Sequence, residues 1–231
     1  MFLTEAELEA IALSMRVSLC AVAIGLPFGV ALAYYLARTR SRFGWLGEVL
    51  VSLPVVLPPV VTGYFLLLLF GRSGPIGRVL ESLFGAHVVF TWIGAAIAAG
   101  VIGFPFIVRS ARLGFEAIDP RLERAARSLG ASRVRVFFTV SLPLASRAVV
   151  AGTVLAFARA IGEFGATIMV AGNIPGQTQT IPLLIFSNTQ TPGQIGRSWR
   201  LVAVSIVIAA AAIIVSEWLE RRGRRHGRAD V

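Results

Sequence analysis

The sequence contains no lysine, because arginine supplies all 22 of its permanently basic side chains. A Walker A loop uses a lysine to bind the nucleotide phosphates, so this absence excludes a P-loop ATPase. Charged residues of both signs are also scarce, at 15% of 231 residues, whereas 56% are hydrophobic. Because a soluble domain carries about 25% charged residues, the composition indicates a membrane protein.

Cysteine and histidine are nearly absent as well. The single cysteine, Cys20, lies in an apolar run and excludes a disulfide framework. His87 and His226 stand alone, so we predict no metal site, and no cluster of catalytic groups within the apolar runs suggests an intramembrane enzyme. The N-terminal stretch MFLTEAELEA lacks the basic segment of a signal peptide, and we therefore expect the first apolar run to be retained.

Five apolar runs are each long enough to cross a bilayer as a helix, which takes about 20 residues. They cover residues 15–37, 45–70, 90–109, 145–171 and 199–219. The sequence therefore predicts an all-α integral membrane protein, with residues 1–231 forming one domain of five transmembrane helices.

The arginines indicate how these spans are oriented. Sixteen lie in the segments that follow the first, third and fifth spans or at the edges of these segments, and four lie in or at the edges of the segments that follow the second and fourth. Cytoplasmic loops carry the excess of basic residues, so we expect the N-terminus outside and the C-terminus in the cytoplasm. The same distribution accounts for most of the net charge of +10 without a nucleic-acid partner.

Prolines are concentrated in the second span, at Pro54, Pro58 and Pro59. Each removes a backbone donor and strains the preceding turn, and broken helices are tolerated in a membrane where protein or a water-filled cavity surrounds them. Two interpretations remain open. The span is either a kinked helix packed against its neighbours or the lining of a gated pathway with Thr62 as a polar contact.

The predicted cytoplasmic segment, residues 115–143, reads as two short helices. Asp119-Pro120 is a start signal, Gly130 is a stop signal, and Ser132 can cap a second turn. In the first helix Leu122, Ala125, Ala126 and Leu129 form an apolar face opposite the polar face of Glu123, Arg124, Arg127 and Ser128. By its pattern alone, such a helix could equally lie on anionic lipid headgroups.

This segment also resembles the coupling motif of ABC importer permeases, in which Glu-Ala-Ala is followed after three residues by Gly and after nine more by Ile-x-Leu-Pro. Ala125-Ala126, Gly130 and Val140-Ser141-Leu142-Pro143 match that spacing, but Arg124 stands where the family has Glu, and Glu123 lies one place earlier. The resemblance implies that a separate ATPase grips this segment, with the acidic contact shifted to Glu123. The implied coupling residues are Glu123, Arg124, Ala125, Ala126, Gly130, Ala131, Leu142 and Pro143.

The resemblance extends over most of the chain and is greatest to the molybdate-type permeases of bacterial ABC importers. It is carried by residues 53–64, 122–144 and 157–182, although the Gly162–Gly165 core is similar to sulfate permeases too. It implies the type I ABC importer permease fold, with no catalytic residue, metal or cofactor in this chain, because ATP and Mg would bind the partner ATPase. It further implies a homodimer in the bacterial cytoplasmic membrane, two cytoplasmic ABC ATPase subunits and an extracytoplasmic oxyanion-binding protein. The cargo would be molybdate or tungstate; the alternatives are a sulfate/thiosulfate permease and, in another class, a membrane anchor whose loop binds lipid.

Two charges inside the fourth span mark a candidate pathway. Arg159 and Glu163 are four residues apart and would share a helix face. Because an intramembrane charge costs about 2.5–3.5 kcal/mol, both should face protein or water; they either guide an anion or form a pair that steadies helix packing. Residues 172–198 form the predicted outer loop, with hydroxyls that either donate to an oxyanion or serve turn chemistry. The candidate pathway residues are Pro58, Pro59, Thr62, Arg159, Glu163, Thr178 and Thr180.

Overall fold

The computed structural model describes residues 3–39, 44–193, 196 and 198–226, and every regular element within these residues is helical. The elements in chain order are α1 (Glu5–Arg38), α2 (Gly44–Val56), α3 (Pro59–Phe70), α4 (Pro75–Phe84), α5 (Trp92–Glu116), α6 (Pro120–Ser128), α7 (Arg133–Val136), the π-helical turn η1 (Phe137–Ser141), α8 (Leu142–Ile161), α9 (Gly165–Ala171), α10 (Ile181–Gln190) and α11 (Ser198–His226).

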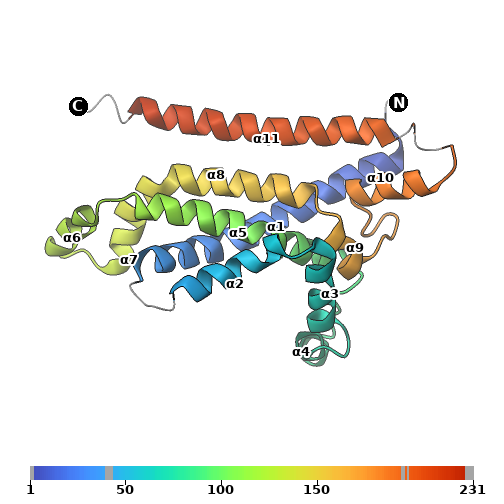
Figure 1. The fold of residues 1–231 in the computed structure, drawn as a ribbon, viewed down its shortest axis with the longest axis horizontal. Coiled ribbons are helices and arrows are strands. Elements are labelled where there is room, and N and C mark those ends of the chain that lie inside the picture. The colour runs from blue at the N-terminus through green and yellow to red at the C-terminus, as the bar shows by residue number, and fades with distance from the viewer. Residues whose placement is uncertain (1–2, 40–43, 194–195, 197, 227–231) are drawn as a thin grey trace.

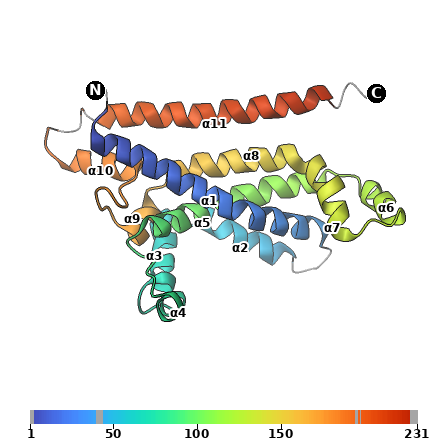
Figure 2. The ribbon, with the colours of Figure 1, turned by 180° about the vertical axis from the view of Figure 1, so that it is seen from behind.

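Long helices lying alongside one another dominate the molecule (Figures 1 and 2). Four described segments are long and apolar enough to cross a membrane: Glu5–Arg38, Trp92–Glu116, Arg133–Ile161 and Ser198–Val215. A fifth span is supplied if α2 and α3 are counted together, although the two are bent by 110° at Leu57-Pro58. The predicted all-α architecture is therefore confirmed, with four candidate spans or, if α2 and α3 count as one, the five predicted, and the break falls at the predicted prolines.

Helix α1 begins ten residues before the predicted start of the first span, because Thr4 and Glu7 form a capping box. Thr4 Oγ1 accepts from the backbone N–H of Glu7 at 3.3 Å, and the Glu7 carboxylate accepts from the N–H of Thr4 at 2.7 Å. The box satisfies two donors that a helix start leaves unpaired. Helix α1 consequently runs for 34 residues and extends past the apolar run at its N-terminal end.

The fourth predicted span, residues 145–171, differs from the structure at both ends. The helix is continuous from Arg133 through η1 to Ile161, and residues 162–164 then interrupt it before α9 begins. Pro143 has no N–H to give to the preceding turn, and the chain widens there into the π turn, in which the N–H of Leu142 bonds the carbonyl of Phe137. Hydropathy does not register either feature.

Helix α5 is the centre of the bundle and packs against both α1 and α8. Its inward positions are rich in alanine, and Ala95, Ala98 and Ala111 are fully buried. At the contact between α5 and α8, a Cβ added to Gly152 would lie 2.7 Å from the Cβ of Ser110. Small residues allow this close approach of backbones, which is how helices associate in a membrane.

The remaining elements lie at the two ends of this bundle (Figure 1). Helices α6 and α7 form a hairpin at the end where α11 finishes, whereas α9 and α10 lie at the end where the chain starts. Helices α3 and α4 project sideways from the bundle. The two groups of candidate functional residues are therefore separated along the bundle axis.

Candidate functional site

The α6–α7 hairpin, residues 119–136, is formed by local capping. The carboxylate of Asp119 accepts from the N–H of Arg121 at 2.8 Å, and Ser132 Oγ accepts from the N–H of Arg135 at 3.3 Å. Gly130, which follows the C-cap of α6, has φ of 86°, a left-handed conformation that favours glycine. The start and stop signals read from the sequence are confirmed at all three positions.

Glu123 fastens this hairpin to the bundle. Its carboxylate accepts hydrogen bonds from Arg38 Nη2 at 2.7 Å, from Arg38 Nε at 3.1 Å and from Ser141 Oγ at 2.8 Å. Arg38 is the last residue of α1 and Ser141 the last of η1, so a single carboxylate links three elements. A bidentate arginine contact of this kind fixes geometry as well as adding energy.

The position of Glu123 corrects the expectation that it lies on an outward polar face with Arg124. Glu123 is 3% exposed, whereas Arg124 is exposed. Burial acts to raise the pKa of the Glu123 carboxyl, but the hydrogen bonds from Arg38 and Ser141 and the charges of Arg38 and Arg127 outweigh it and hold the pKa below its ordinary value. The carboxylate therefore acts inside the chain, and a direct acidic contact with a partner does not fit its geometry.

An aromatic cluster anchors the second leg of the hairpin. The ring of Phe137 lies 5.0 Å from Tyr34 and 6.1 Å from Phe115, and Tyr34 lies 5.2 Å from Phe115. These edge and tilted arrangements contribute about 0.5–1.5 kcal/mol per pair beyond their buried area. The three rings come from α1, α5 and η1, so the cluster packs the turn that follows the hairpin against two helices of the bundle.

The outer surface of the hairpin carries large apolar side chains among its arginines, and nothing in the described chain covers them. Leu129 at the tip is 88% exposed, and Leu122, Val134 and Phe138 are each exposed by roughly half or more. Of the other predicted coupling residues, Ala125, Gly130 and Pro143 are exposed, and Ala126, Ala131 and Leu142 are half-buried. We call the exposed apolar side chains of Leu122, Ala125, Leu129, Val134 and Phe138 the hairpin tip surface. A protein that exposes large apolar side chains together in this way presents an interaction site.

At the opposite end, the broken second span packs against the break in the fourth. A Cβ on Gly63 of α3 would lie 2.8 Å from the Cα of Ala166, and one on Gly165 of α9 would lie 3.0 Å from the Cβ of Pro59. Two glycines thus let the Pro58-Pro59 turn contact the start of α9, about a hundred residues later in the chain. The structure therefore brings together two of the three stretches that carry the family resemblance.

Within this junction Thr62 is buried, and its hydroxyl has no hydrogen-bond partner in the described part of the chain. An unpaired buried hydroxyl is unfavourable. Close packing of α3 on α9 agrees with the kinked-helix interpretation, while the unpaired hydroxyl leaves a polar group for a solute. Both interpretations of the second span therefore remain predictions.

Arg159 and Glu163 form an ion pair, with Arg159 Nη1 2.6 Å from Glu163 Oε2. The pair does not lie on one helical face as expected, because α8 ends at Ile161 and Glu163 belongs to the break. Instead, Glu163 Oε1 accepts from the N–H of Ala166 at 2.8 Å, in the first turn of α9. The Glu163 side chain is 1% exposed and that of Arg159 is 32% exposed, so only the cation reaches the surface.

The outer loop between α9 and α10 is closed by its own hydrogen bonds. Thr178 Oγ1 accepts from the N–H of Ile174 at 3.0 Å, and Gln179 Nε2 donates to Asn173 Oδ1 at 2.9 Å. Thr178 and Thr180 are both buried. In this conformation their hydroxyls do not face solvent, and the bonding of Thr178 is the turn chemistry that the sequence left as one alternative.

Sequence reasoning missed three residues at the hairpin: Arg38, Ser141 and Tyr34. Arg38 contributed only to the charge count, and 85 residues separate it from Glu123. No local pattern joins such a pair. No group of three His, Cys, Asp or Glu side chains in the described ranges is placed to hold a metal ion.

A bundle of apolar spans with broken helices at one end and a braced hairpin at the other indicates a multi-pass membrane protein, and broken spans of this kind are typical of transporters. The chain belongs to the family of binding-protein-dependent transport system inner membrane components, whose model matches residues 25–225. It is accordingly a multi-pass inner membrane protein.

Relatives match over nearly the whole chain. The molybdenum transport system permease protein ModB of Escherichia coli (strain K12) is 49% identical over 99% of this chain and 100% of its own length. The protein of the same name from Haemophilus influenzae is 46% identical over 94% of each chain. The sulfate transport system permease protein CysT of Salmonella typhimurium is 37% identical over 87% of this chain and 71% of its own length.

A solved structure shares the fold at low sequence identity. A chain of a bacterial ABC transporter involved in the import of the acidic polysaccharide alginate superimposes with a TM-score of 0.75 and 17% identity, covering 96% of this chain and 81% of that one. The expected importer permease fold is therefore confirmed.

Proposed function

We propose that this chain is the membrane-spanning permease subunit of an ATP-driven molybdate importer. It acts as a homodimer with two cytoplasmic ATPase subunits, receives its cargo from an extracytoplasmic oxyanion-binding protein, and moves the intact oxyanion by alternating access. Tungstate, a dianion of the same shape, is carried by the same path. The cargo assignment is supported by the full-length similarity to the molybdenum permeases, which is higher than that to the sulfate permease.

The observation that carries the proposal is the braced hairpin with its exposed apolar tip. The hairpin tip surface offers Leu122, Ala125 and Leu129 to a cleft in the ATPase, and the φ of Gly130 keeps the turn compact. The Glu123 contacts with Arg38 and Ser141 tie the hairpin to α1 and to the start of α8. When two ATPase subunits close on ATP, a push on the tip becomes a rigid-body tilt of these helices.

The orientation follows from the arginines. The hairpin and the C-terminal end of α11 lie at the same end of the bundle (Figure 1), and both belong to the arginine-rich segments that the positive-inside rule assigns to the cytoplasm. The N-terminus, with its acidic residues, then lies outside. ATP and Mg belong to the partner ATPase, because this chain has no lysine for a phosphate loop.

The oxyanion pathway is assigned to the junction of α3 with the break after α8. Arg159 is the exposed cation there, and the buried Glu163 neutralises much of its charge at 2.6 Å. Such a partly neutralised cation attracts a dianion without trapping it, as conduction through a pathway requires. Thr62 adds an unpaired hydroxyl at the same junction. Pro58 and Pro59 set the bend that keeps α3 out of line with α2.

Uptake competition by the reconstituted complex tests the cargo. Proteoliposomes containing this chain, its ATPase and the binding protein should accumulate molybdate only with ATP. An equal concentration of tungstate should reduce the uptake by about half, whereas a tenfold excess of sulfate should leave it unchanged. Inhibition by sulfate as strong as that by tungstate would assign the chain to the sulfate type instead.

Association with the ATPase tests the class. Detergent-solubilised chain should co-purify with the ATPase, and Leu129→Asp should abolish this while Leu83→Asp, at another exposed leucine on α4, should not. If neither variant nor the native chain binds an ATPase, and the hairpin instead binds anionic vesicles, the chain is a lipid-binding anchor and the transport proposal is wrong.

A further inference from the structure

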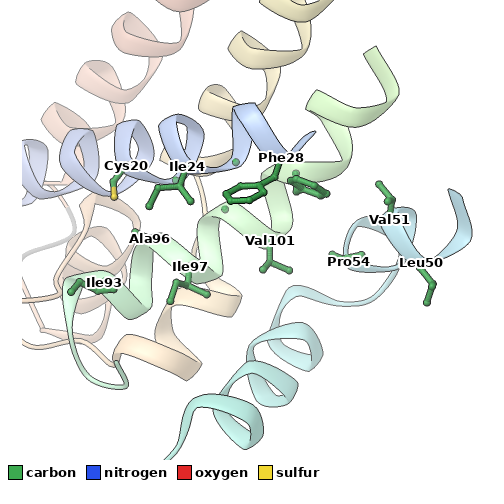
Figure 3. Close-up of a pocket in the computed structure, with 14 residues that line it drawn as sticks. Cys20, Ile24, Phe28, Leu50, Val51, Pro54, Ile93, Ala96, Ile97 and Val101 are labelled. Atoms are coloured by element: carbon green, nitrogen blue, oxygen red, sulfur yellow. The ribbon is translucent and has the colours of Figure 1, made fainter. Parts of the chain in front are cut away.

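An open apolar groove of about 480 Å³ lies between α1, α2 and α5. Its volume falls within the roughly 300–1,000 Å³ of small-molecule sites, yet its walls bear no charged side chain. Figure 3 shows Cys20 and Ile93 at one end and Leu50 and Val51 at the other, with Ile24, Phe28 and Val101 between them. Such a surface does not suit a hydrophilic anion, so the groove is distinct from the proposed oxyanion pathway.

A cation stands near one end of the groove. Arg16 lies one helical turn before Cys20 on the same face of α1, and its guanidinium carbon is 3.8 Å from the ring centroid of Trp92, the neighbour of Ile93. Arg16 is exposed and pairs with no carboxylate among the described residues. The groove is thus apolar along its length, and a cation stands one helical turn beyond its Cys20 end.

The spacing of arginines on α1 places this end at the membrane surface. Arg16 and Arg38 are separated by 22 residues of helix, or about 33 Å, close to the ~30 Å of a bilayer core. Arginine and tryptophan are characteristic of the two interfaces. The groove follows α1 from Cys20 to Phe28 for about 12 Å, and Arg16 lies about 6 Å further out along the helix, so together they span about the depth of one leaflet.

We propose that this groove binds one glycerophospholipid of the leaflet nearer the N-terminus, with the phosphate on Arg16 and an acyl chain along Cys20, Ile24 and Phe28. The charge beyond the Cys20 end, the apolar lining and the leaflet-length depth together match the chemistry of that one ligand. The lipid fills the space between α2 and the α1–α5 pair. It therefore supports α2, which has no buried residue of its own.

Cys20 supplies a built-in reporter, because it is the only cysteine of the chain and lines the groove. The complete importer complex is purified, stripped of lipid in detergent and treated with N-ethylmaleimide, and modification of the Cys20 peptide is followed by mass spectrometry. Dioleoyl phosphatidylglycerol should slow the modification several-fold, and glycerol phosphate, which is the headgroup without chains, should have no effect.

Variants separate the two ends of the site. Arg16→Gln should raise the phosphatidylglycerol concentration needed for protection about fivefold, the effect of one basic residue at a lipid surface. Arg78→Gln on α4, which removes the same charge away from the groove, should leave it unchanged. Ile24→Trp should fill the groove from an exposed position and abolish lipid retention in native mass spectrometry.

Three results would overturn the assignment. Equal lipid dependence in Arg16→Gln and Arg78→Gln would remove the headgroup contact. Protection of Cys20 in the fully delipidated complex would mean that a second copy or a partner protein covers the groove. Protection by glycerol phosphate alone would indicate a free-phosphate site and no role for the acyl chain.

Discussion

Replacing Glu123 with glutamine should loosen the coupling hairpin without unfolding the bundle. The substitution keeps the shape of the side chain but removes the charge that Arg38 contacts through two nitrogens. Breaking a fully buried pair costs about 3–5 kcal/mol and an exposed one about 0–1 kcal/mol. Because the Arg38 side chain is 24% exposed and can regain water, we expect a cost of about 2 kcal/mol, between these limits.

Hydrogen exchange measures this cost directly. A loss of about 2 kcal/mol should raise the exchange rate of backbone amides in residues 121–130 roughly 30-fold, while amides in the centre of α5 stay protected. In proteoliposomes the same variant should hydrolyse more ATP per molybdate imported, because a loosened hairpin no longer moves α1 and α8 together. Glu81→Gln on α4, an exposed carboxylate, is the matched control.

Coupling to Arg38 provides the decisive comparison. Arg38→Gln alone should raise the amide exchange rate of residues 121–130 at least as much as Glu123→Gln does, because it leaves the buried Glu123 carboxylate without its main partner. The double variant should lose less than the sum of the two single losses. An amide exchange rate of residues 121–130 in Glu123→Gln within twofold of the wild-type rate would refute the role of this pair. A free-energy loss in the double variant equal to the sum of the two single losses would refute it as well.

The pH dependence of hairpin protection has a definite sign. Because the folded pKa of Glu123 lies below its ordinary value of 4.5, its contribution is complete above pH 4.5 and is lost as the pH falls through the lowered folded pKa. Protection of residues 121–130 should therefore be flat from pH 8 to 5 and decline only below about 4.5. Glu123→Gln should lack that decline; a parallel decline in both proteins would assign it to other groups.

Three further predictions concern the two ends of the bundle. Leu129→Asp should abolish stimulation of the ATPase by the permease. It should leave the melting temperature within about 2 °C of wild type, since the side chain is 88% exposed. A large drop in melting temperature would mean that Leu129 is structural. Gly63→Ala should destabilise the solubilised protein by about 1–3 kcal/mol, because its Cβ would lie 2.8 Å from the backbone of Ala166. Gly100→Ala is the control: the nearest contact of its Cβ is at 3.6 Å, so it should be neutral in the same melting assay. Arg159→Gln should destabilise more than Glu163→Gln, because it strands a carboxylate that is 1% exposed while Arg159 itself reaches the surface; the reverse order of melting temperatures would argue against a structural role for the pair.

Local patterns predicted the elements well where the signals are local. The capping residues Asp119 and Ser132 and the stop at Gly130 all occupy the expected positions, because a cap involves atoms within three or four residues. The bend at Pro58-Pro59 was likewise expected, since proline removes a donor wherever it stands. Hydropathy located the spans but gave wrong ends for the fourth, because an average over many residues passes over a three-residue break.

The direction in which each side chain faces could not be read from the sequence. The polar and apolar faces of α6 were identified, but a water-soluble helix would have buried Leu122 and exposed Glu123, and the structure does the opposite. The apolar side chain of Leu122 stays exposed, and the carboxylate of Glu123 is paired with Arg38 inside the chain. Family resemblance predicted a coupling role for this segment but not this internal bond.

By itself, the sequence determined that the chain spans a membrane several times, which segments are basic, where helices start and stop, and that the phosphate-binding lysine of an ATPase is missing. Each of these depends on composition or on neighbours a few residues apart. Only the tertiary structure decided that Glu123 joins α1 to η1, that the Pro58-Pro59 bend rests on Gly165, and that Arg16 stands one helical turn beyond the end of an apolar groove. These contacts join residues up to about a hundred positions apart, and the packing of helices, which no local pattern encodes, brings them together.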